Sequence, residues 1–172
     1  NLGKTKKEVK RIIHEKNVVL NGKIIYDERN PMGLFDVLSL PLIKKNYKLD
    51  LTENGKFKLE EIKESEAGTK IAKIINKTLM KDKKIQLNLS DGGNILSQER
   101  CKTNDSVIIN FKTKKIEKII PLKENSKVII FSGKHIGGTG KIEKLNEQDK
   151  TAKIKVGDKI ENVLIKQVMV ID

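Results

Sequence analysis

The first apolar pattern along the chain has a helical period. Within residues 5–17 the apolar positions share one helical face: Val9, Ile12 and Ile13. Thr5 and Glu8 have the spacing of a capping box, in which each side chain binds the backbone N–H of the other residue. Asn17 is expected to adopt the left-handed conformation that ends a helix. A short amphipathic helix is therefore predicted here.

After residue 17 the apolar runs shorten to the length of strands, with turn residues between them. Asn21-Gly22 and Asn54-Gly55 each separate two such runs, which is a strong hairpin signal. The stretch 70–80 fits either a helical face or one face of a strand, so its periodicity leaves both open. The other runs predict short strands, which are 18–20, 23–26, 37–42, 47–51, 57–62, 85–89, 95–96, 107–111, 128–131, 141–145, 151–156 and 163–171.

This pattern predicts an α+β fold that is mainly β, in three segments. Residues 1–42 contain the helix and the first hairpin, and residues 43–124 form a small central β-rich domain. Pro121 and the polar run 123–126 precede the third segment, residues 125–172, for which a small five-stranded barrel is expected.

The charge of the chain indicates what kind of partner it binds. The 172 residues include 36 Lys and Arg against 23 Asp and Glu, a formal net charge of +13, and arginine occurs only three times. A positive field of this size favours polyanions as partners, and lysine suits phosphate better than base edges. It also opposes self-association, so the isolated chain is expected to be a monomer.

Several function classes lose support from the composition. One cysteine and two histidines form no internal disulfide and no four-ligand zinc site, and no apolar run has the length of a membrane span. We expect an intracellular protein without membrane contact, metal or cofactor. No base, nucleophile and electrophile come together, so no catalytic residue is predicted. Cys101 lies beside Arg100, which could lower its pKa, but a lone cysteine is usually inert.

A glycine-rich loop spans residues 133–142. A phosphate-binding P-loop would need glycine at His135 and Ser or Thr at Ile142, so that reading fails. Alternating apolar residues that lead into Gly133, Gly137 and Gly140 resemble instead a KOW motif. This resemblance implies an SH3-like barrel, with Lys134, His135 and Lys141 facing RNA phosphate. The alternatives are an ordinary hairpin loop and, for His135, a plain surface histidine.

The helix and the Asn21 hairpin, followed by Gly33 and Asp36, resemble the RNA-binding motif named after bacterial small-subunit ribosomal protein four. That motif has a further helix upstream, so either residues before Asn1 are missing from this chain or the match to the motif is partial. The resemblance implies RNA contacts from the helix and the hairpin; a solvated basic surface is the alternative. The candidate residues are Lys4, Lys6, Lys7, Lys10, Arg11, Asn21 and Lys23.

The order of these segments is more specific than any one motif. A four-type RNA-binding motif, a β-rich middle and a KOW barrel, in this order, resemble the four-e family of small-subunit ribosomal proteins, which is archaeal and eukaryotic. The resemblance covers essentially the whole chain. It implies a non-enzymatic constituent of the cytoplasmic ribosome that binds small-subunit rRNA and neighbouring ribosomal proteins and supports translation. The runner-up is a KOW-containing transcription or translation factor, and an RNA-modifying enzyme is a third possibility that lacks a visible cofactor fold.

Overall fold

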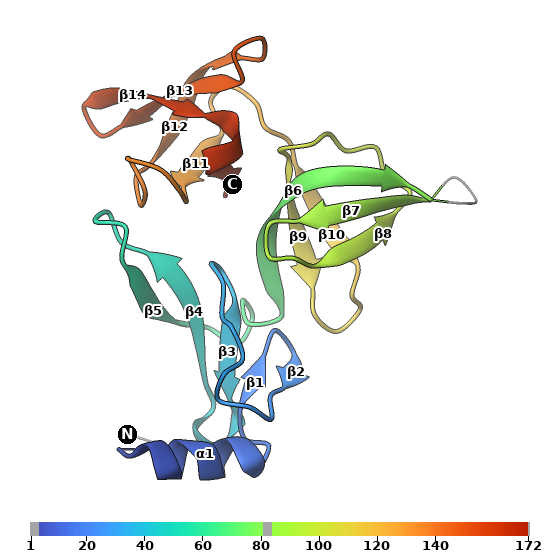
Figure 1. Cartoon of the computed structure of the whole chain (residues 1–172), viewed down its shortest axis with the longest axis vertical. Coiled ribbons are helices and arrows are strands. Elements are labelled where there is room, and N and C mark those ends of the chain that lie inside the picture. The colour runs from blue at the N-terminus through green and yellow to red at the C-terminus, as the bar shows by residue number, and fades with distance from the viewer. Residues whose placement is uncertain (1–3, 81–83, 172) are drawn as a thin grey trace. The chain divides into compact units, whose positions relative to one another are not determined.

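The computed structural model describes residues 4–80 and 84–171 and contains one α-helix and three five-stranded sheets (Figure 1). The outer ends of the first and third predicted segments, residues 1–3 and 172, lie outside the described residues. A mainly β fold with one short helix confirms the coarse expectation from the sequence.

The helix and the first sheet come from the N-terminal part of the chain. The sheet has the strand order β2-β1-β3-β4-β5, and a 3-10 helix, Pro41–Ile43, lies between its third and fourth strands. The predicted boundary between residues 42 and 43 therefore lies between two paired strands of one sheet. The elements are α1 (Lys6–His14), β1 (Val19–Leu20), β2 (Lys23–Ile24), β3 (Val37–Leu40), β4 (Lys45–Leu51) and β5 (Phe57–Ile62).

The other two sheets follow one another along the chain. The second has the order β10-β9-β6-β7-β8 and the third β14-β13-β12-β11-β15. A 3-10 helix, Ile165–Gln167, precedes the last strand. The strands of the second sheet are β6 (Thr69–Leu79), β7 (Ile85–Leu89), β8 (Asn94–Ser97), β9 (Ser106–Asn110) and β10 (Ile116–Ile120). Those of the third are β11 (Lys127–Ile130), β12 (Thr139–Asn146), β13 (Thr151–Val156), β14 (Lys159–Leu164) and β15 (Val168–Val170).

Both ends of α1 are capped by local hydrogen bonds. The capping box is present, with the Thr5 side chain accepting from the Glu8 backbone and the Glu8 side chain accepting from the Thr5 backbone. At the other end the expected residue was wrong, because Lys16 and not Asn17 has the left-handed conformation, at φ 61°. The N–H of Asn17 then reaches back to Ile12 and that of Lys16 to Ile13, which satisfies the last carbonyls of the helix.

The stretch 70–80, which periodicity left open, is part of strand β6. Strands β7 and β9 flank β6, so its backbone groups are paired across the sheet rather than within a helix. Ala72 and Ile74 enter the core of this sheet, and a register shift between Ile74 and Asn76 changes which face the following side chains occupy. Pairing with neighbouring strands therefore determines the secondary structure of this stretch, which its local sequence leaves ambiguous.

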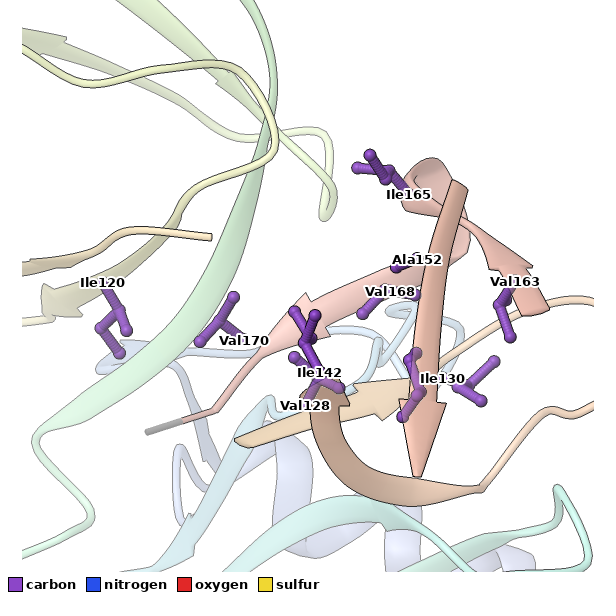
Figure 2. Packing of buried hydrophobic residues seen from close by; sticks show 10 residues of the cluster. Ile120, Val128, Ile130, Ile142, Ala152, Val163, Ile165, Val168 and Val170 are labelled. Atoms are coloured by element: carbon purple, nitrogen blue, oxygen red, sulfur yellow. The ribbon is translucent and has the colours of Figure 1, made fainter. Parts of the chain in front are cut away.

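Each of the last two sheets has an apolar core, and Ile120 of β10 joins the core of the third sheet. In the third sheet, alternate residues of paired strands turn inward, among them Val128, Ile142 and Val168, all at 0% exposure (Figure 2). In the second sheet, Leu87 and Val107 are equally buried. The period-2 alternation of the sequence is thus the pattern of one buried and one exposed face.

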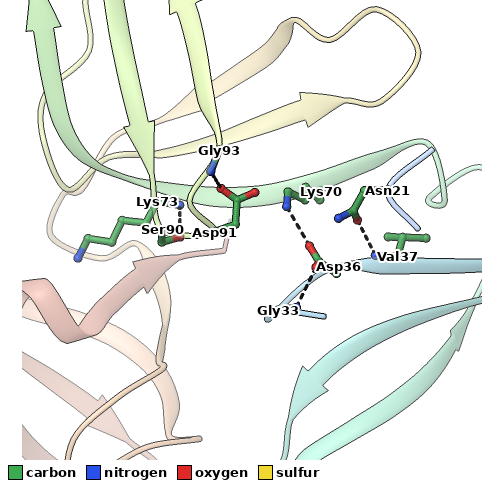
Figure 3. A network of polar contacts seen from close by, with 9 residues as sticks. All are labelled: Asn21, Gly33, Asp36, Val37, Lys70, Lys73, Ser90, Asp91 and Gly93. Atoms are coloured by element: carbon green, nitrogen blue, oxygen red, sulfur yellow. Dashed lines mark hydrogen bonds and ion pairs between the residues drawn. The ribbon is translucent and has the colours of Figure 1, made fainter. Parts of the chain in front are cut away.

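The chain divides into two compact units. The first contains the chain up to Asp50 with 58–70 and 110–113, and the second contains 51–57, 71–109 and the chain from Lys114 onward. In the first unit, buried Asp36 pairs with Lys70 at 2.9 Å and accepts from the Gly33 N–H at 2.8 Å (Figure 3). The central and C-terminal sheets belong to the same unit, so contacts between them are part of its interior.

Polar groups join the two sheets of the second unit. The ammonium of Lys73, on β6, donates to the carbonyls of Ile165 at 2.5 Å and Val168 at 2.6 Å. The Ser106 hydroxyl accepts from the Val170 N–H at 3.0 Å. Because these groups are buried, their hydrogen bonds hold one sheet in a defined position on the other.

Candidate nucleic-acid interface

The outer face of the third sheet has a row of three lysines on three neighbouring strands. Lys127 pairs with Lys141, and Lys141 pairs with Lys155. Paired residues of antiparallel strands point to the same face, with Cβ atoms about 5 Å apart. All three side chains are exposed, while their chain neighbours Val128 and Ile154 are buried. The strand pairing thus lines up three ammonium groups on one surface.

A second row lies beside the first. Lys144 of β12 pairs with Lys153 of β13, and both are exposed. A register shift between Ile142 and Lys144 places Glu143 between the two rows, as an extra residue on β12 and an exposed carboxylate beside the lysines. We call the five lysines 127, 141, 144, 153 and 155 the lysine rows.

The lysine rows are electrostatically unfavourable in the isolated protein. Like charges directly opposite each other destabilise a sheet by a few tenths of a kcal/mol or more. In the described part of the chain none of the five forms an ion pair or a side-chain hydrogen bond. A polyanion laid across both rows would remove this repulsion and exchange condensed counterions for lysine contacts.

The three residues of the glycine-rich loop that were expected to face RNA have different surroundings in the structure. Lys141 belongs to the lysine rows, and Lys134 is exposed in the loop. His135 is half-buried, and its Nδ1 lies 3.3 Å from the Glu161 carboxylate, an ion pair when the imidazole is protonated. Its imidazole therefore lies close to a carboxylate of the protein itself.

The glycines of this loop have neighbours from the protein itself. A Cβ at Gly140 would overlap the Lys155 carbonyl, and one at Gly137 would overlap the Thr52 carbonyl. At Gly133, with φ +92°, a Cβ would lie 2.5 Å from the Gln167 side chain. These close approaches explain glycine at each position through packing within the second unit.

The basic helix α1 is partly neutralised by the protein's own carboxylates. Lys6 and Lys10 share the Glu28 carboxylate at 3.2 and 3.5 Å, and Arg11 pairs with Glu15 at 2.9 Å. In the described part of the chain Lys7 has no such partner, and its side chain is exposed. Lys7 is thus the basic group of the helix with the fewest competing interactions.

The remaining N-terminal candidates differ in whether their side chains already form hydrogen bonds within the protein. The backbone N–H of Lys4 donates to the Glu8 carboxylate at 2.7 Å, which is the largest cause of a lowered Glu8 pKa, and its side chain is exposed. Asn21 uses its side-chain oxygen to accept from the Val37 N–H at 3.0 Å (Figure 3), while Lys23 beside it is exposed. Asn21 is therefore a structural residue of the turn whatever else it binds.

The structure offers little support for other chemistry among the residues it describes. Burial raises the pKa of the Cys101 thiol, contrary to the lowered pKa that Arg100 beside it could have caused. No group of three or more His, Cys, Asp or Glu residues in 4–80 and 84–171 could hold a metal ion. Within the same ranges, no helix is long and apolar enough to cross a membrane.

Four of the five lysines in the rows were not singled out from the sequence. Lys127, Lys144, Lys153 and Lys155 look like ordinary polar positions of strands, because their alignment depends on which strands pair and in which register. The only available signal was the alternation of lysine with buried apolar residues in 151–156, which predicts one basic face.

Comparison with known proteins finds similarity to a ribosomal family and to its members. Residues 43–116 match the sequence model of the ribosomal family S4e. The small ribosomal subunit protein eS4 of Methanocella arvoryzae is 39% identical over 138 residues, which are 80% of this chain and 58% of that protein. The eS4 protein of Nanoarchaeum equitans is 36% identical over 86% of this chain and 63% of its own length.

A solved structure agrees in fold. The crystal structure of the 30S ribosomal protein S4e from Thermoplasma acidophilum has a TM-score of 0.82 with this chain at 22% identity, covering 98% of this chain and 86% of that one. The chain is similar in sequence to the ribosomal S4e family, in agreement with the resemblance to the four-e family. It spans roughly three fifths of the length of these two curated relatives, 58% and 63%.

Proposed function

We propose that this chain is a structural, non-enzymatic constituent of the small subunit of the cytoplasmic ribosome. It binds small-subunit rRNA through basic surfaces and thereby supports translation. The observation that carries this proposal is the pair of lysine rows, because unpaired cations in register on a β face match a phosphate backbone. Relatives named as small ribosomal subunit proteins support the same partner class.

The binding mode that follows is dominated by phosphate. Lysine contacts position a protein on RNA but read little sequence, so selectivity comes from the shape of the folded rRNA. Each lysine that neutralises a phosphate releases condensed counterions, and the sum over many contacts supplies the affinity. The lysine rows, Lys134 and Lys7 are the groups that this mode uses first, because in the described chain they are exposed and have no acidic partner.

In our proposal the chain consists of three modules that together bind rRNA. Residues 1–42 act as a four-type RNA-binding motif, 43–124 as a central domain and 125–172 as a KOW domain with an SH3-like barrel. The five-stranded third sheet and the packed glycine loop support the barrel assignment. The capped basic helix beside a tight Asn21-Gly22 turn supports the N-terminal motif.

The alternative, a KOW-containing transcription or translation factor, receives no support from the relatives described above, which are named as ribosomal proteins. Sedimentation separates the two roles. A structural constituent stays with the small subunit after a high-salt wash, whereas a factor leaves it.

A charge-removal experiment tests the lysine rows. The triple variant Lys144→Gln, Lys153→Gln, Lys155→Gln removes three charges from the rows, and Lys58→Gln, Lys63→Gln, Lys112→Gln removes three exposed charges elsewhere. Binding to small-subunit rRNA is titrated across salt concentrations for both. The slope of log affinity against log salt is negative. The first variant should reduce its magnitude by about 2 to 3, and the control variant by less than 1. Equal losses for the two variants contradict a specific role of the rows.

A further inference from the structure

A cleft of about 750 Å³ lies within the second compact unit, outside the surfaces assigned so far. Its walls come from both sheets of that unit. Lys77 belongs to β6 and Leu122 follows β10, whereas Leu145 and Leu164 belong to β12 and β14. Sites for small molecules and cofactors have volumes of roughly 300 to 1,000 Å³. The cleft is therefore large enough for one nucleotide.

Part of the cleft wall is apolar. Leu122 and Leu145 are half-buried and pack against the core of the third sheet, and Ile165 is buried. Leu164 beside them is 39% exposed. Apolar side chains in a concave site supply contact area for a flat ring, while a few polar groups fix its orientation. The apolar wall thus suits a nucleobase better than it suits a phosphate.

Three exposed lysines line the same cleft. In the described part of the chain Lys102, Lys150 and Lys166 form no ion pair and no side-chain hydrogen bond. The N–H of Ile165 donates to the Lys150 carbonyl at 2.9 Å, which ties the turn that contains Lys150 to the 3-10 helix that contains Lys166. Lys77 differs, because its ammonium donates to a backbone carbonyl at 2.5 Å. The three other lysines are available for a phosphate group.

The cleft also contains carboxylates, which differ in their existing bonds. Both oxygens of buried Asp105 accept backbone N–H bonds, at 2.8 and 3.0 Å, and Asp149 accepts from the Asn146 amide at 2.5 Å. Glu147 is exposed and has no such partner in the described chain. A carboxylate repels phosphate but accepts hydrogen bonds from the amino groups of adenine, cytosine and guanine, which uracil lacks. Glu147 therefore favours a base with an amino group.

The lysine rows lead to this cleft along the third sheet. Two residues beyond the pair Lys144–Lys153, Asn146 pairs with Thr151, and Thr151 pairs with Leu164 on the next strand. Two residues along a strand correspond to about 7 Å. Leu164, which lines the cleft, therefore lies on the line of paired residues next to the second lysine row. An RNA strand bound to the lysine rows reaches the cleft without leaving the sheet.

We propose that the cleft binds one unpaired nucleotide of the rRNA, with a base that carries an exocyclic amino group. This inference rests on the proposed function, because the lysine rows bring the RNA strand to the cleft. The base packs against the apolar wall and donates from its amino group to Glu147, and its phosphate contacts the exposed lysines. The cleft thereby adds a base-selective contact to a surface that otherwise binds phosphate.

NMR of the full chain with labelled Leu and Ile methyl groups and labelled backbone amides tests the proposal. The probes are short single strands of adenylate, of uridylate and of abasic ribose phosphate. The adenylate strand should shift the methyl signals of Leu122, Leu164 and Ile165 saturably. It should bind roughly fivefold more tightly than the uridylate strand, the worth of about one net hydrogen bond. The abasic strand should shift only the amide signals of the lysine rows.

Two carboxylate variants form a matched pair for the same titrations. Glu147→Ala removes the acceptor from the cleft, whereas Glu143→Ala removes an exposed carboxylate beside the lysine rows and outside the cleft. Both raise the affinity for every strand, because each removes one negative charge. Only Glu147→Ala should reduce the preference for adenylate over uridylate, to less than about twofold. Glu143→Ala should keep the preference of the unmodified chain.

The outcomes separate this inference from the proposed function. Shifts of the lysine-row signals without shifts of the cleft methyl groups overturn the inference and leave the proposed function standing. Equal affinities for adenylate and uridylate overturn it as well, as does a preference that survives Glu147→Ala. If intact small-subunit rRNA shifts neither the lysine-row signals nor the cleft signals, the proposed function fails, and this inference fails with it.

Discussion

At the scale of single residues, Lys73 is the least expected feature of the protein. Its side chain is 2% exposed, its ammonium lies 5.7 Å from the Phe131 ring centroid, and it donates to two backbone carbonyls. Burial lowers the pKa of Lys73 to about 8. A lysine is usually exposed, even between apolar neighbours such as Ala72 and Ile74, so the role of Lys73 between two sheets was not visible from the sequence.

The lowered pKa of Lys73 predicts a pH-dependent stability. Between pH 8 and about 10.5 the unfolded chain keeps the Lys73 proton while the folded protein releases it, so the free energy of unfolding rises with pH. The contribution reaches about 3 kcal/mol at the high end of this window. Chemical denaturation of the protein and of Lys73→Met at several pH values measures it as the difference between the two curves. If the free energies of unfolding of the protein and of Lys73→Met change with pH in parallel across this window, the lowered pKa of buried Lys73 is contradicted.

Two glycines of the third sheet allow a matched test of packing. Gly140→Ala would force a Cβ into the Lys155 carbonyl, whereas a Cβ at Gly157, with φ +58°, meets nothing within 4 Å. Gly157→Ala should cost about 1 kcal/mol for its backbone conformation alone, and Gly140→Ala at least about 2 to 3 kcal/mol from overlap. Thermal or chemical denaturation measures the free energy of unfolding of both variants. Equal losses would show that Gly140 is not packed as described.

At the scale of elements, the paired strands β12 and β13 show how function is placed on a sheet. The turns and most strands were predictable, because Asn-Gly pairs and period-2 alternation report local structure directly. The lysine rows were not predictable, because a row exists only after the register Lys144–Lys153 and Lys141–Lys155 is known. The stretch 70–80 shows the same limit, since neighbouring strands and not local spacing make it a strand.

Opposed lysines predict a stability gain that accompanies lost binding. Lys153→Gln removes a charge opposite Lys144, while Lys159→Gln removes a charge opposite Val156. At low salt the first should raise the free energy of unfolding by about 0.5 kcal/mol, and the second should leave it nearly unchanged. The gain should shrink at about 1 M salt because screening weakens the repulsion. A gain that is equal for both variants, or insensitive to salt, contradicts the opposed-charge account.

The helix α1 makes a prediction about which of its cations matter. Lys10 shares the Glu28 carboxylate, whereas Lys7 is without an ion-pair partner in the described chain. Lys7→Gln should therefore weaken rRNA binding more than Lys10→Gln, with a larger decrease in the salt slope. Filter binding or fluorescence anisotropy with small-subunit rRNA measures both. Equal effects would mean that Glu28 does not compete with RNA for Lys10.

At the scale of the whole molecule, the order of segments was more informative than any single motif. A net charge of +13 indicated a polyanionic partner, and the order of helix with hairpin, β-rich middle and glycine loop indicated the family to which the chain is similar. The domain limits stay a prediction. The central and C-terminal sheets lie in one compact unit, in which Lys73 forms buried polar contacts from one sheet to the other. Such contacts join residues that are far apart along the chain.

The most direct test of the central claim is binding of this chain to intact small-subunit rRNA and to an unrelated duplex RNA of similar length, titrated across salt. We expect saturable binding to the rRNA with a clear preference at physiological salt, because the lysine surfaces are arranged on a fixed fold. Equal affinities for the two RNAs that vanish together as salt rises would contradict the claim, because they would leave only the general attraction of a lysine-rich protein for any polyanion.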